Sequence, residues 1–296
     1  MDKARVWSII KIVLKIGITA LSLYLVFKKV DPKDLKSAFY TTNPFFLLAA
    51  LIFFVISQII SASRLNSFFK GIGLHISEGY NFRIYLLGMF YNLFLPGGIG
   101  GDGYKVFLLK KLHKTSARKL LWAIFFDRLS GLWALALIIS ALIFFLPHLG
   151  IPYWIPVTVI AAGTILYYVI MKRFFKNYCK TFALTHFKAL MVQSMQIVSV
   201  IFLLYALHFE GKFSPYLFMF LVSSLVAIFP FTVGGLGARE IVFIYGADLL
   251  GYDEHLAVMV SLLFYCISAL LSFTGIYFVF RPRRLELPID KTDIPI

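Results

Sequence analysis

Two glycine-rich segments interrupt apolar stretches of this chain, one in each half of the sequence. They read FLPGGIGGDG at residues 94–103 and FPFTVGGLGARE at residues 229–240, and ionisable residues accompany the glycines in both. A bilayer accepts a broken helix or a charged side chain only where it faces protein or water. A pair of such breaks in corresponding positions of two halves indicates the binding site of a transporter. The breaks therefore predict an integral membrane protein that moves a substrate.

The composition agrees with a membrane location. Hydrophobic residues make up 60% of the 296 residues and the mean hydropathy is +0.85, whereas only 15% of the residues are charged. Soluble domains are about a quarter charged. Cysteine occurs only at Cys179 and Cys266, so a disulfide framework is not expected.

The formal net charge of +15 raises the question of a nucleic-acid partner. The basic residues, however, lie in short loops beside apolar segments, where they suit the anionic headgroups of a cytoplasmic leaflet. We therefore expect a membrane phospholipid or a lipid-linked substrate as the partner, and no nucleic acid.

The apolar runs predict six spanning helices, because each approaches the roughly 20 residues that cross a hydrocarbon core. No small-residue cleavage site closes the first run, so we expect a retained helix rather than a signal peptide. The six predicted helices are residues 8–27, 44–64, 120–146, 152–171, 190–208 and 256–280.

Two further apolar regions, residues 81–111 and 215–250, differ from these six because the glycine breaks divide them. Each arm is near the lower length limit for crossing a bilayer. We predict that each region forms a helix, a turn and a second helix that enter and leave on the same side, as a re-entrant helical hairpin. The predicted fold class is an all-α integral membrane protein, an inverted-repeat bundle of six spanning helices and two such hairpins.

The distribution of Lys and Arg supports this layout. With two re-entrant hairpins, 22 of the 29 basic residues lie on one side of the membrane and five on the other. The positive-inside rule makes the richer side cytoplasmic, together with both termini. We therefore expect a multi-pass protein of the cell inner (cytoplasmic) membrane.

The same layout makes the two halves inverted copies, as in many secondary transporters. We expect one transmembrane domain over residues 1–283, with halves at about 1–146 and 147–283, and a flexible cytoplasmic tail at 284–296.

The glycines of the breaks are candidate binding residues, because a backbone without Cβ allows close approach. Helix N-termini near Asp102 and Ala238 would point partial positive charge toward the middle of the protein, which suits a phosphate or carboxylate. A tight helix crossing that needs small residues explains the same glycines without a ligand. The candidate glycines are Gly97, Gly98, Gly100, Gly234, Gly235 and Gly237.

Ionisable residues follow both breaks and also stand inside one predicted span, where charge is costly enough to suggest function. Arg128 or Arg239 could hold a lipid phosphate through bidentate hydrogen bonds, and acidic residues could balance those arginines or bind an amine. Asp127 and Arg128 diverge by about 100° on a helix, so we do not expect them to pair only with each other. An internal ion-pair network that holds the hairpins is the alternative. The candidates are Asp102, Lys105, Asp127, Arg128, Arg239, Glu240 and Asn92.

Signatures of the common catalytic and metal sites are absent from the sequence. The chain has no GxxxxGK[ST] phosphate loop and no GxSxG, HExxH or CxxC motif, and its six histidines show no metal-ligand spacing. We therefore expect no enzyme activity, no cofactor, no metal and no ATP-driven pumping by this chain alone.

Three motifs resemble the transmembrane region of the lysylphosphatidylglycerol synthase/flippase family, also called multiple peptide resistance factor. They are LPGGIGGDGYK at residues 95–105, DRLSG at 127–131 and PFTVGGLGARE at 230–240. The resemblance implies a region that moves aminoacylated phospholipids between leaflets, with functional weight on Asp102, Arg128 and the Arg239-Glu240 pair. Full-length members add a soluble domain that aminoacylates lipid from tRNA, whereas this sequence ends at Ile296, so we expect a stand-alone flippase-like member.

The leading hypothesis from the sequence is a lipid flippase for an anionic or aminoacylated phospholipid, or for a polyprenyl-phosphate lipid. One alternative is a secondary transporter of a small anionic solute. Another is a non-transporting membrane subunit of an envelope-lipid synthesis complex. A homo-oligomer or a partner enzyme of lipid synthesis is compatible with each hypothesis.

Overall fold

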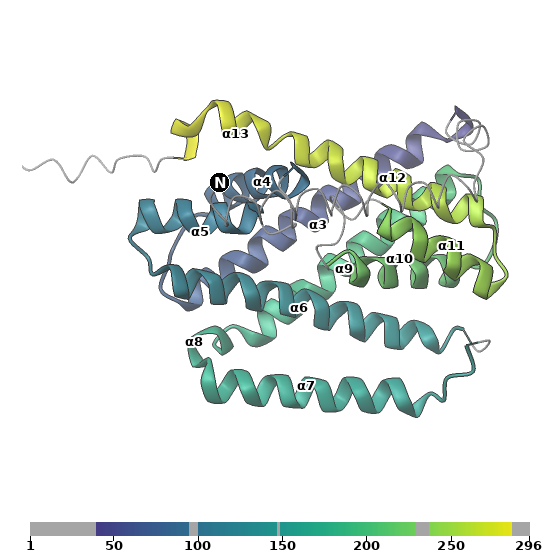
Figure 1. Ribbon diagram of the computed structural model, residues 1–296, viewed down its shortest axis with the longest axis horizontal. Coiled ribbons are helices and arrows are strands. Elements are labelled where there is room, and N and C mark those ends of the chain that lie inside the picture. The colour runs from purple at the N-terminus through teal and green to yellow at the C-terminus, as the bar shows by residue number, and fades with distance from the viewer. Residues whose placement is uncertain (1–39, 95–99, 147–148, 229–236, 286–296) are drawn as a thin grey trace, which may run out of the picture.

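The computed structural model describes residues 40–94, 100–146, 149–228 and 237–285. Every regular element in these ranges is a helix, and none is a strand (Figure 1). The elements are α3 (Pro44–Gly71), α4 (Glu78–Phe94), α5 (Gly100–His113), α6 (Ala117–Ile143), α7 (Trp154–Phe174), α8 (Lys176–Cys179), α9 (Phe182–Ala206), α10 (Ser214–Val226), α11 (Ala238–Leu250), α12 (Glu254–Phe273), α13 (Ile276–Phe280) and the 3₁₀ helix η2 (Pro282–Leu285).

Local sequence signals begin two of the long helices. The Asn43 side chain accepts a hydrogen bond from the Phe45 N–H at 2.9 Å, and Pro44 occupies the first position of α3. Asp253 likewise accepts from the Leu256 N–H at 3.0 Å at the start of α12. These caps satisfy backbone donors that have no partner within the helix.

Five helical segments are long and apolar enough to cross a membrane: α3, α6, α7, α9 and the continuous stretch of α12 and α13. They coincide with five of the six predicted spans, and the sixth, residues 8–27, lies outside the described residues. α3 runs past its predicted end and α9 begins before its predicted start, because backbone hydrogen bonding continues beyond the apolar run in each case. The all-α class of membrane protein is therefore confirmed.

α7 shows how strongly this fold departs from that of a soluble protein. Only Pro156 and Met171 are buried on this helix, while apolar residues such as Ile165, Leu166 and Val169 are exposed along it. Water would not tolerate apolar surface of this extent, whereas lipid tails cover it without cost.

α3 and α9 form the central antiparallel pair. The Asn43 N–H donates to the Ala206 carbonyl at 2.9 Å, so the start of α3 meets the end of α9. Midway, the Ser199 hydroxyl donates to the Ala50 carbonyl at 2.8 Å. Hydrogen bonds from a hydroxyl to a neighbouring helix are typical of helix pairs in membranes, where small and weakly polar residues allow close contact.

Each glycine break separates two helices that pack on each other. Figure 1 shows α4 and α5 at one end of the molecule and α10 and α11 at the other. α4 and α5 cross so closely that a Cβ on Gly101 would overlap the backbone of Gly88. This crossing needs glycine, which supports the small-residue interpretation of the first break.

Buried apolar clusters hold the two ends of the bundle. One includes Phe220, Phe243 and Phe264 from α10, α11 and α12, and the other includes Phe68 and Phe126 from α3 and α6. Within a bilayer, such clusters contribute through dispersion contacts between closely packed side chains rather than through exclusion of water.

The basic loops gather at one end of the molecule. The end of α3, the connection between α5 and α6, the short helix α8 and η2 lie together there in Figure 1. The connections α9–α10 and α11–α12 lie at the other end. This arrangement brings together the segments that the sequence assigns to one face of the membrane.

Candidate functional site

Asp102 is the centre of a buried ion cluster in the first turn of α5. Lys105 Nζ, one turn along the same helix, donates to Asp102 Oδ1 at 3.1 Å. Arg128 Nε, from α6, donates to Asp102 Oδ2 at 2.7 Å. Asp102 and Lys105 are buried, whereas the Arg128 side chain keeps 38% of its surface exposed. Two cations therefore meet one carboxylate, and Arg128 is the more accessible of them.

Asp127 belongs to a second ion pair, with Arg64 of α3. Arg64 Nε donates to Asp127 Oδ1 at 2.8 Å and Arg64 Nη2 to Asp127 Oδ2 at 3.3 Å. Both side chains are buried. This forked geometry is the strongest form of an arginine–carboxylate contact. Asp127 and Arg128 thus have different partners, as expected from their divergence on the helix.

The sequence analysis has Arg64 only as the last residue of the predicted span 44–64, and the structure adds it to the candidate site. The side chain turns into the bundle because Asp127 offers a forked acceptor there. A signal for this was present: Ser57, Ser61 and Arg64 recur at helical spacing in an otherwise apolar run, which indicates a polar face directed at the protein interior.

Both ion clusters line one cavity of about 190 Å³ enclosed by α3, α4, α5 and α6. Three cationic side chains and two carboxylates face it, which leaves one positive charge in excess. The cationic residues are Arg64, Lys105 and Arg128, and the acidic residues are Asp102 and Asp127. Such a cavity is suited to an anion, with carboxylates placed to accept from an amine beside it.

Neutral side chains complete the cavity. The Tyr85 ring lies 4.6 Å from Lys105 Nζ, measured to the ring centroid, and its hydroxyl donates to Ser61 Oγ at 2.9 Å. Asn92, also on the cavity wall, accepts a hydrogen bond from the Gly101 N–H at 2.8 Å through Oδ1. Asn92 thus both lines the cavity and fastens the end of α4 to the start of α5.

A second cavity, of about 180 Å³, continues the polar space toward the outside of the bundle. Met89 and Asn92 line both cavities, so the two meet at the same stretch of α4. On the other side, the second cavity is lined by Tyr265, Ser268 and Ser272 of α12. The polar surface therefore reaches the seam between α4 and α12.

The residues after the second break have other partners. The capping Gly237 has φ 85°, a conformation that favours glycine, and its N–H donates to Glu240 Oε2 at 2.6 Å. The Ser261 hydroxyl donates to Glu240 Oε1 at 2.7 Å. The Arg239 guanidinium lies 5.5 Å from the centroid of the Phe264 ring. Both carboxylate oxygens of Glu240 are therefore occupied by neutral donors.

In the described part of the chain, the residues that follow the two breaks have different surroundings. All residues that line the 190 Å³ cavity come from α3 to α6. Arg239 and Glu240 instead contact the aromatic and hydroxyl groups of α12. The physical reason is that α12 offers Ser261 and Phe264 to the second pair, whereas α6 offers Arg128 to the first.

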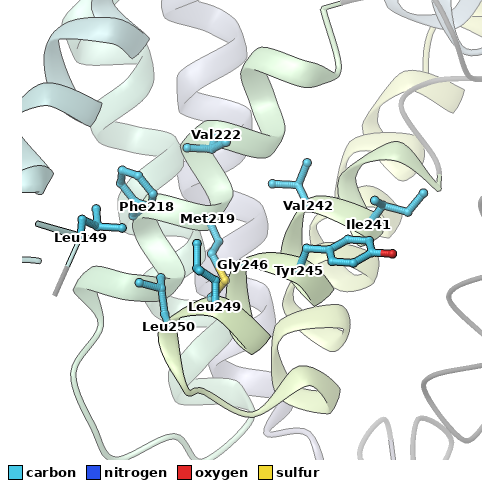
Figure 2. A pocket seen from close by; sticks show the side chains of 10 residues that line it. All are labelled: Leu149, Phe218, Met219, Val222, Ile241, Val242, Tyr245, Gly246, Leu249 and Leu250. Atoms are coloured by element: carbon cyan, nitrogen blue, oxygen red, sulfur yellow. The ribbon is translucent and has the colours of Figure 1, made fainter. Parts of the chain in front are cut away.

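The second helix pair has a cavity of a different kind (Figure 2). It holds about 350 Å³ and is almost entirely apolar. Side chains of α10 and α11 surround it, among them Phe218, Met219 and Leu249, with Leu149 from the connection between α6 and α7. It offers dispersion contacts and no charge, so it cannot orient an anion.

The candidate glycines divide into those that the structure describes and those that it does not. Gly100 begins α5 and Gly237 caps α11, so the two helices start where the sequence places their N-termini. Gly97, Gly98, Gly234 and Gly235 lie outside the described residues. Within the described ranges, no group of three or more His, Cys, Asp or Glu residues is placed to hold a metal ion.

The fold and this site define a class: a multi-pass, all-α membrane protein with ion pairs and a polar cavity inside the bundle. Residues 12–275 match the family described as the lysylphosphatidylglycerol synthase TM region, and the chain belongs to this family. No curated protein matches the chain.

Proposed function

We propose that this protein is a lipid flippase that moves an anionic or aminoacylated phospholipid, or a polyprenyl-phosphate lipid, between the leaflets of the cytoplasmic membrane. The observation that carries the proposal is the charged cavity of α3 to α6, surrounded by helices whose outer surfaces are apolar. Charge in such a place is costly and is typical of a substrate pathway.

The charges suit a phosphate that carries an amine. Arg128 is the most exposed cation of the cavity, so it is the first that a phosphate would meet. Lys105 and Arg64 lie deeper. Asp102 and Asp127 would balance these cations or accept from the amine of an aminoacylated headgroup.

The seam between α4 and α12 is the proposed access route from the membrane. Ser268 and Ser272 of α12 line the outer cavity and Asn92 joins it to the inner one, so a headgroup would meet polar groups along the way. The acyl chains would remain in the bilayer, against the apolar outer surface. This separation of headgroup and tail lowers the barrier for moving a phosphate through hydrocarbon.

The two helix pairs would act as re-entrant hairpins of an inverted repeat, entering from opposite faces. Their location at opposite ends of the bundle supports this arrangement (Figure 1). Rocking of one half against the other would then expose the cavity to each leaflet in turn.

A leaflet assay on reconstituted vesicles tests the proposal. A fluorescent anionic phospholipid is added, and its transfer between leaflets is measured by chemical quenching. Asp102→Ala and Asp102→Asn should slow the transfer by at least about tenfold, equivalent to ~1.4 kcal/mol, because Lys105 and Arg128 lose their shared counter-charge.

Glu78→Ala is the matched control, since Glu78 is an acidic residue in an exposed ion pair with Lys70. Its transfer rate should equal that of the wild type. Arg239→Ala tests whether the second pair contributes to the same pathway. Wild-type transfer in both Asp102 variants would contradict the proposed site, and vesicles without any protein-dependent transfer would contradict the function.

The size of the inner cavity favours a second candidate, a secondary transporter of a small anion. A volume of about 190 Å³ is below the range of sites for larger ligands. Uptake of labelled inorganic phosphate into vesicles that carry a pH gradient distinguishes the two. Uptake without lipid transfer would favour the small-anion transporter.

A further inference from the structure

Gly88 is a buried residue of α4 that lies directly against the side chain of Lys105 from α5. A Cβ built on Gly88 would overlap Lys105 Cε, and it would lie 3.1 Å from Nζ and 3.3 Å from Cδ. The three atoms nearest to this Cβ position all belong to Lys105. The end of the Lys105 side chain therefore occupies the space that the missing side chain of Gly88 leaves open.

Gly88 stands on the face of α4 that is directed at the charged cavity. Tyr85 and Asn92 line the cavity, three positions before and four positions after Gly88, and this spacing puts the three residues on one face of a helix. Lys105 Nζ lies 4.6 Å from the centroid of the Tyr85 ring and 3.1 Å from Asp102 Oδ1. The ammonium group is thus held between α4 and α5, at the position that Gly88 leaves free.

Lys105 supplies the excess positive charge of the cavity. Arg64 forms an ion pair with Asp127, and Arg128 forms one with Asp102. Without Lys105, the two arginines and the two aspartates that face the cavity would balance. The Lys105 side chain is only 6% exposed, so its charge is weakly screened by solvent and acts strongly on a headgroup in the cavity.

An alanine at position 88 would move Lys105 without breaking the contact between the two helices. The methylene stem of Lys105 is flexible and can give way to a new methyl group. Gly101 differs in this respect, because its Cβ would meet the backbone of Gly88, which cannot move aside. Alanine also favours a helix over glycine by about 1 kcal/mol. Gly88→Ala should therefore draw the ammonium away from Asp102 and Tyr85 while the fold is kept.

We infer that Gly88 is a specificity-determining residue, because its lack of a side chain lets Lys105 place an unbalanced positive charge where the headgroup binds. This inference rests on the proposed translocation of a lipid that carries a phosphate. Phosphatidylglycerol has a net negative headgroup. Phosphatidylcholine carries the same phosphate but is net neutral, and it has no N–H to donate to the carboxylates. The Lys105 charge therefore favours the first of these lipids over the second.

The test compares labelled phosphatidylglycerol with labelled phosphatidylcholine of identical acyl chains, in vesicles of one composition that contain the full chain. The wild type should transfer phosphatidylglycerol at least about tenfold faster, equivalent to ~1.4 kcal/mol. Gly88→Ala should bring this ratio close to one by slowing phosphatidylglycerol, and its unfolding in detergent micelles should match that of the wild type. Lys105→Met keeps the length of the side chain but removes its charge, and it should lower the ratio to the same extent.

Gly103→Ala is the matched control, since Gly103 is an exposed glycine of α5 whose added Cβ would meet open space. It should keep the wild-type ratio. The double variant Gly88→Ala/Lys105→Met should show no lower ratio than either single variant, because both changes remove the same charge from the cavity. A further fall in the double variant would overturn the link between the two residues.

The remaining outcomes separate this inference from the proposed function. A wild-type ratio in Gly88→Ala or in Lys105→Met would overturn the inference. A loss of stability in Gly88→Ala as large as that in Gly101→Ala would do the same, because it would make Gly88 a packing residue. Equal wild-type rates for the two lipids would overturn the selection by charge but leave the flippase proposal intact. Absence of protein-dependent transfer would overturn both.

Discussion

The two helix pairs begin from similar sequences and end with different chemistry. Each has a glycine break followed by an acidic residue at the start of its second helix. In the first pair, Asp102 accepts hydrogen bonds from Lys105 and Arg128 and lines a charged cavity. In the second pair, Glu240 accepts hydrogen bonds from the Gly237 N–H and the Ser261 hydroxyl. The cavity beside this second pair is apolar (Figure 2).

This difference teaches that a repeated motif specifies a helix start and an acidic group, whereas the neighbouring helix specifies what the acid does. α6 approaches the first pair with a cation, and α12 approaches the second with a hydroxyl and an aromatic ring. Glu240 therefore acts as a structural cap, and Asp102 remains in contact with the cavity. The following predictions test this contrast.

The largest contrast should come from Arg64, which is buried, and Arg239, which is partly buried. Arg64→Leu leaves Asp127 buried without a counter-charge and should lower the free energy of unfolding by about 3–5 kcal/mol. Arg239→Leu removes the cation–π contact with Phe264 and should cost about 1 kcal/mol or less. Unfolding in detergent micelles measures both. The double variant Arg64→Leu/Asp127→Leu should recover most of the loss, and equal losses for the two single variants would contradict the contrast.

A glycine in each pair gives the next contrast. Gly101→Ala places a Cβ into the backbone of Gly88 and should destabilise the protein by about 3 kcal/mol, because a backbone cannot move aside. In Gly246→Ala the new Cβ lies 2.8 Å from Met219 Cγ, on a flexible side chain that can shift. We expect about 1 kcal/mol or less, by the same measurement. A larger loss for Gly246→Ala would refute the difference in packing.

Glu240 itself should behave as a cap. Glu240→Ala removes hydrogen bonds to Gly237 and Ser261 and should lower stability by about 1–2 kcal/mol. Lipid transfer, measured at a temperature where the variant is folded, should stay near the wild-type rate. Glu240→Gln keeps one acceptor for the Gly237 N–H and should lose less. A loss of transfer in Glu240→Gln that matches Asp102→Asn would place both pairs in the pathway.

The smallest effect concerns the exposed ion pair of Lys70 and Glu78. Burial raises the pKa of Glu78, but hydrogen bonds from Lys70 and Asn66 and the positive charges of Lys70 and Lys188 together outweigh it and hold the pKa below its usual value. A carboxyl group whose pKa is lower in the folded than in the unfolded state stabilises the fold at pH values above its unfolded-state pKa. This stabilisation is lost as the pH falls through the folded-state pKa. Glu78→Gln should therefore differ from the wild type by only about 0.5 kcal/mol at neutral pH, and by nothing near pH 3. A larger pH-dependent difference in unfolding would show that this pair is not screened by solvent.

The sequence predicted the spanning helices well because their signal is local. A run of apolar residues marks each of α3, α6, α7 and α9 whatever the neighbours are, since the requirement comes from the bilayer. The starts of α5 and α11 were also readable, because glycine and an acidic residue define them on their own. Arg64 was not predicted as a site residue because its role depends on Asp127, which lies 63 positions later in the chain.

The amino-acid sequence by itself determined a helical membrane protein with two broken segments and an excess of cationic charge beside them. Only the tertiary structure decided that Arg64 forms an ion pair with Asp127, that Asp102 binds two cationic side chains and that Glu240 caps a helix. The physical reason is that apolar periodicity acts over a few residues of one helix. The partner of a buried charge, by contrast, is whichever group the packing of another helix brings within hydrogen-bond distance.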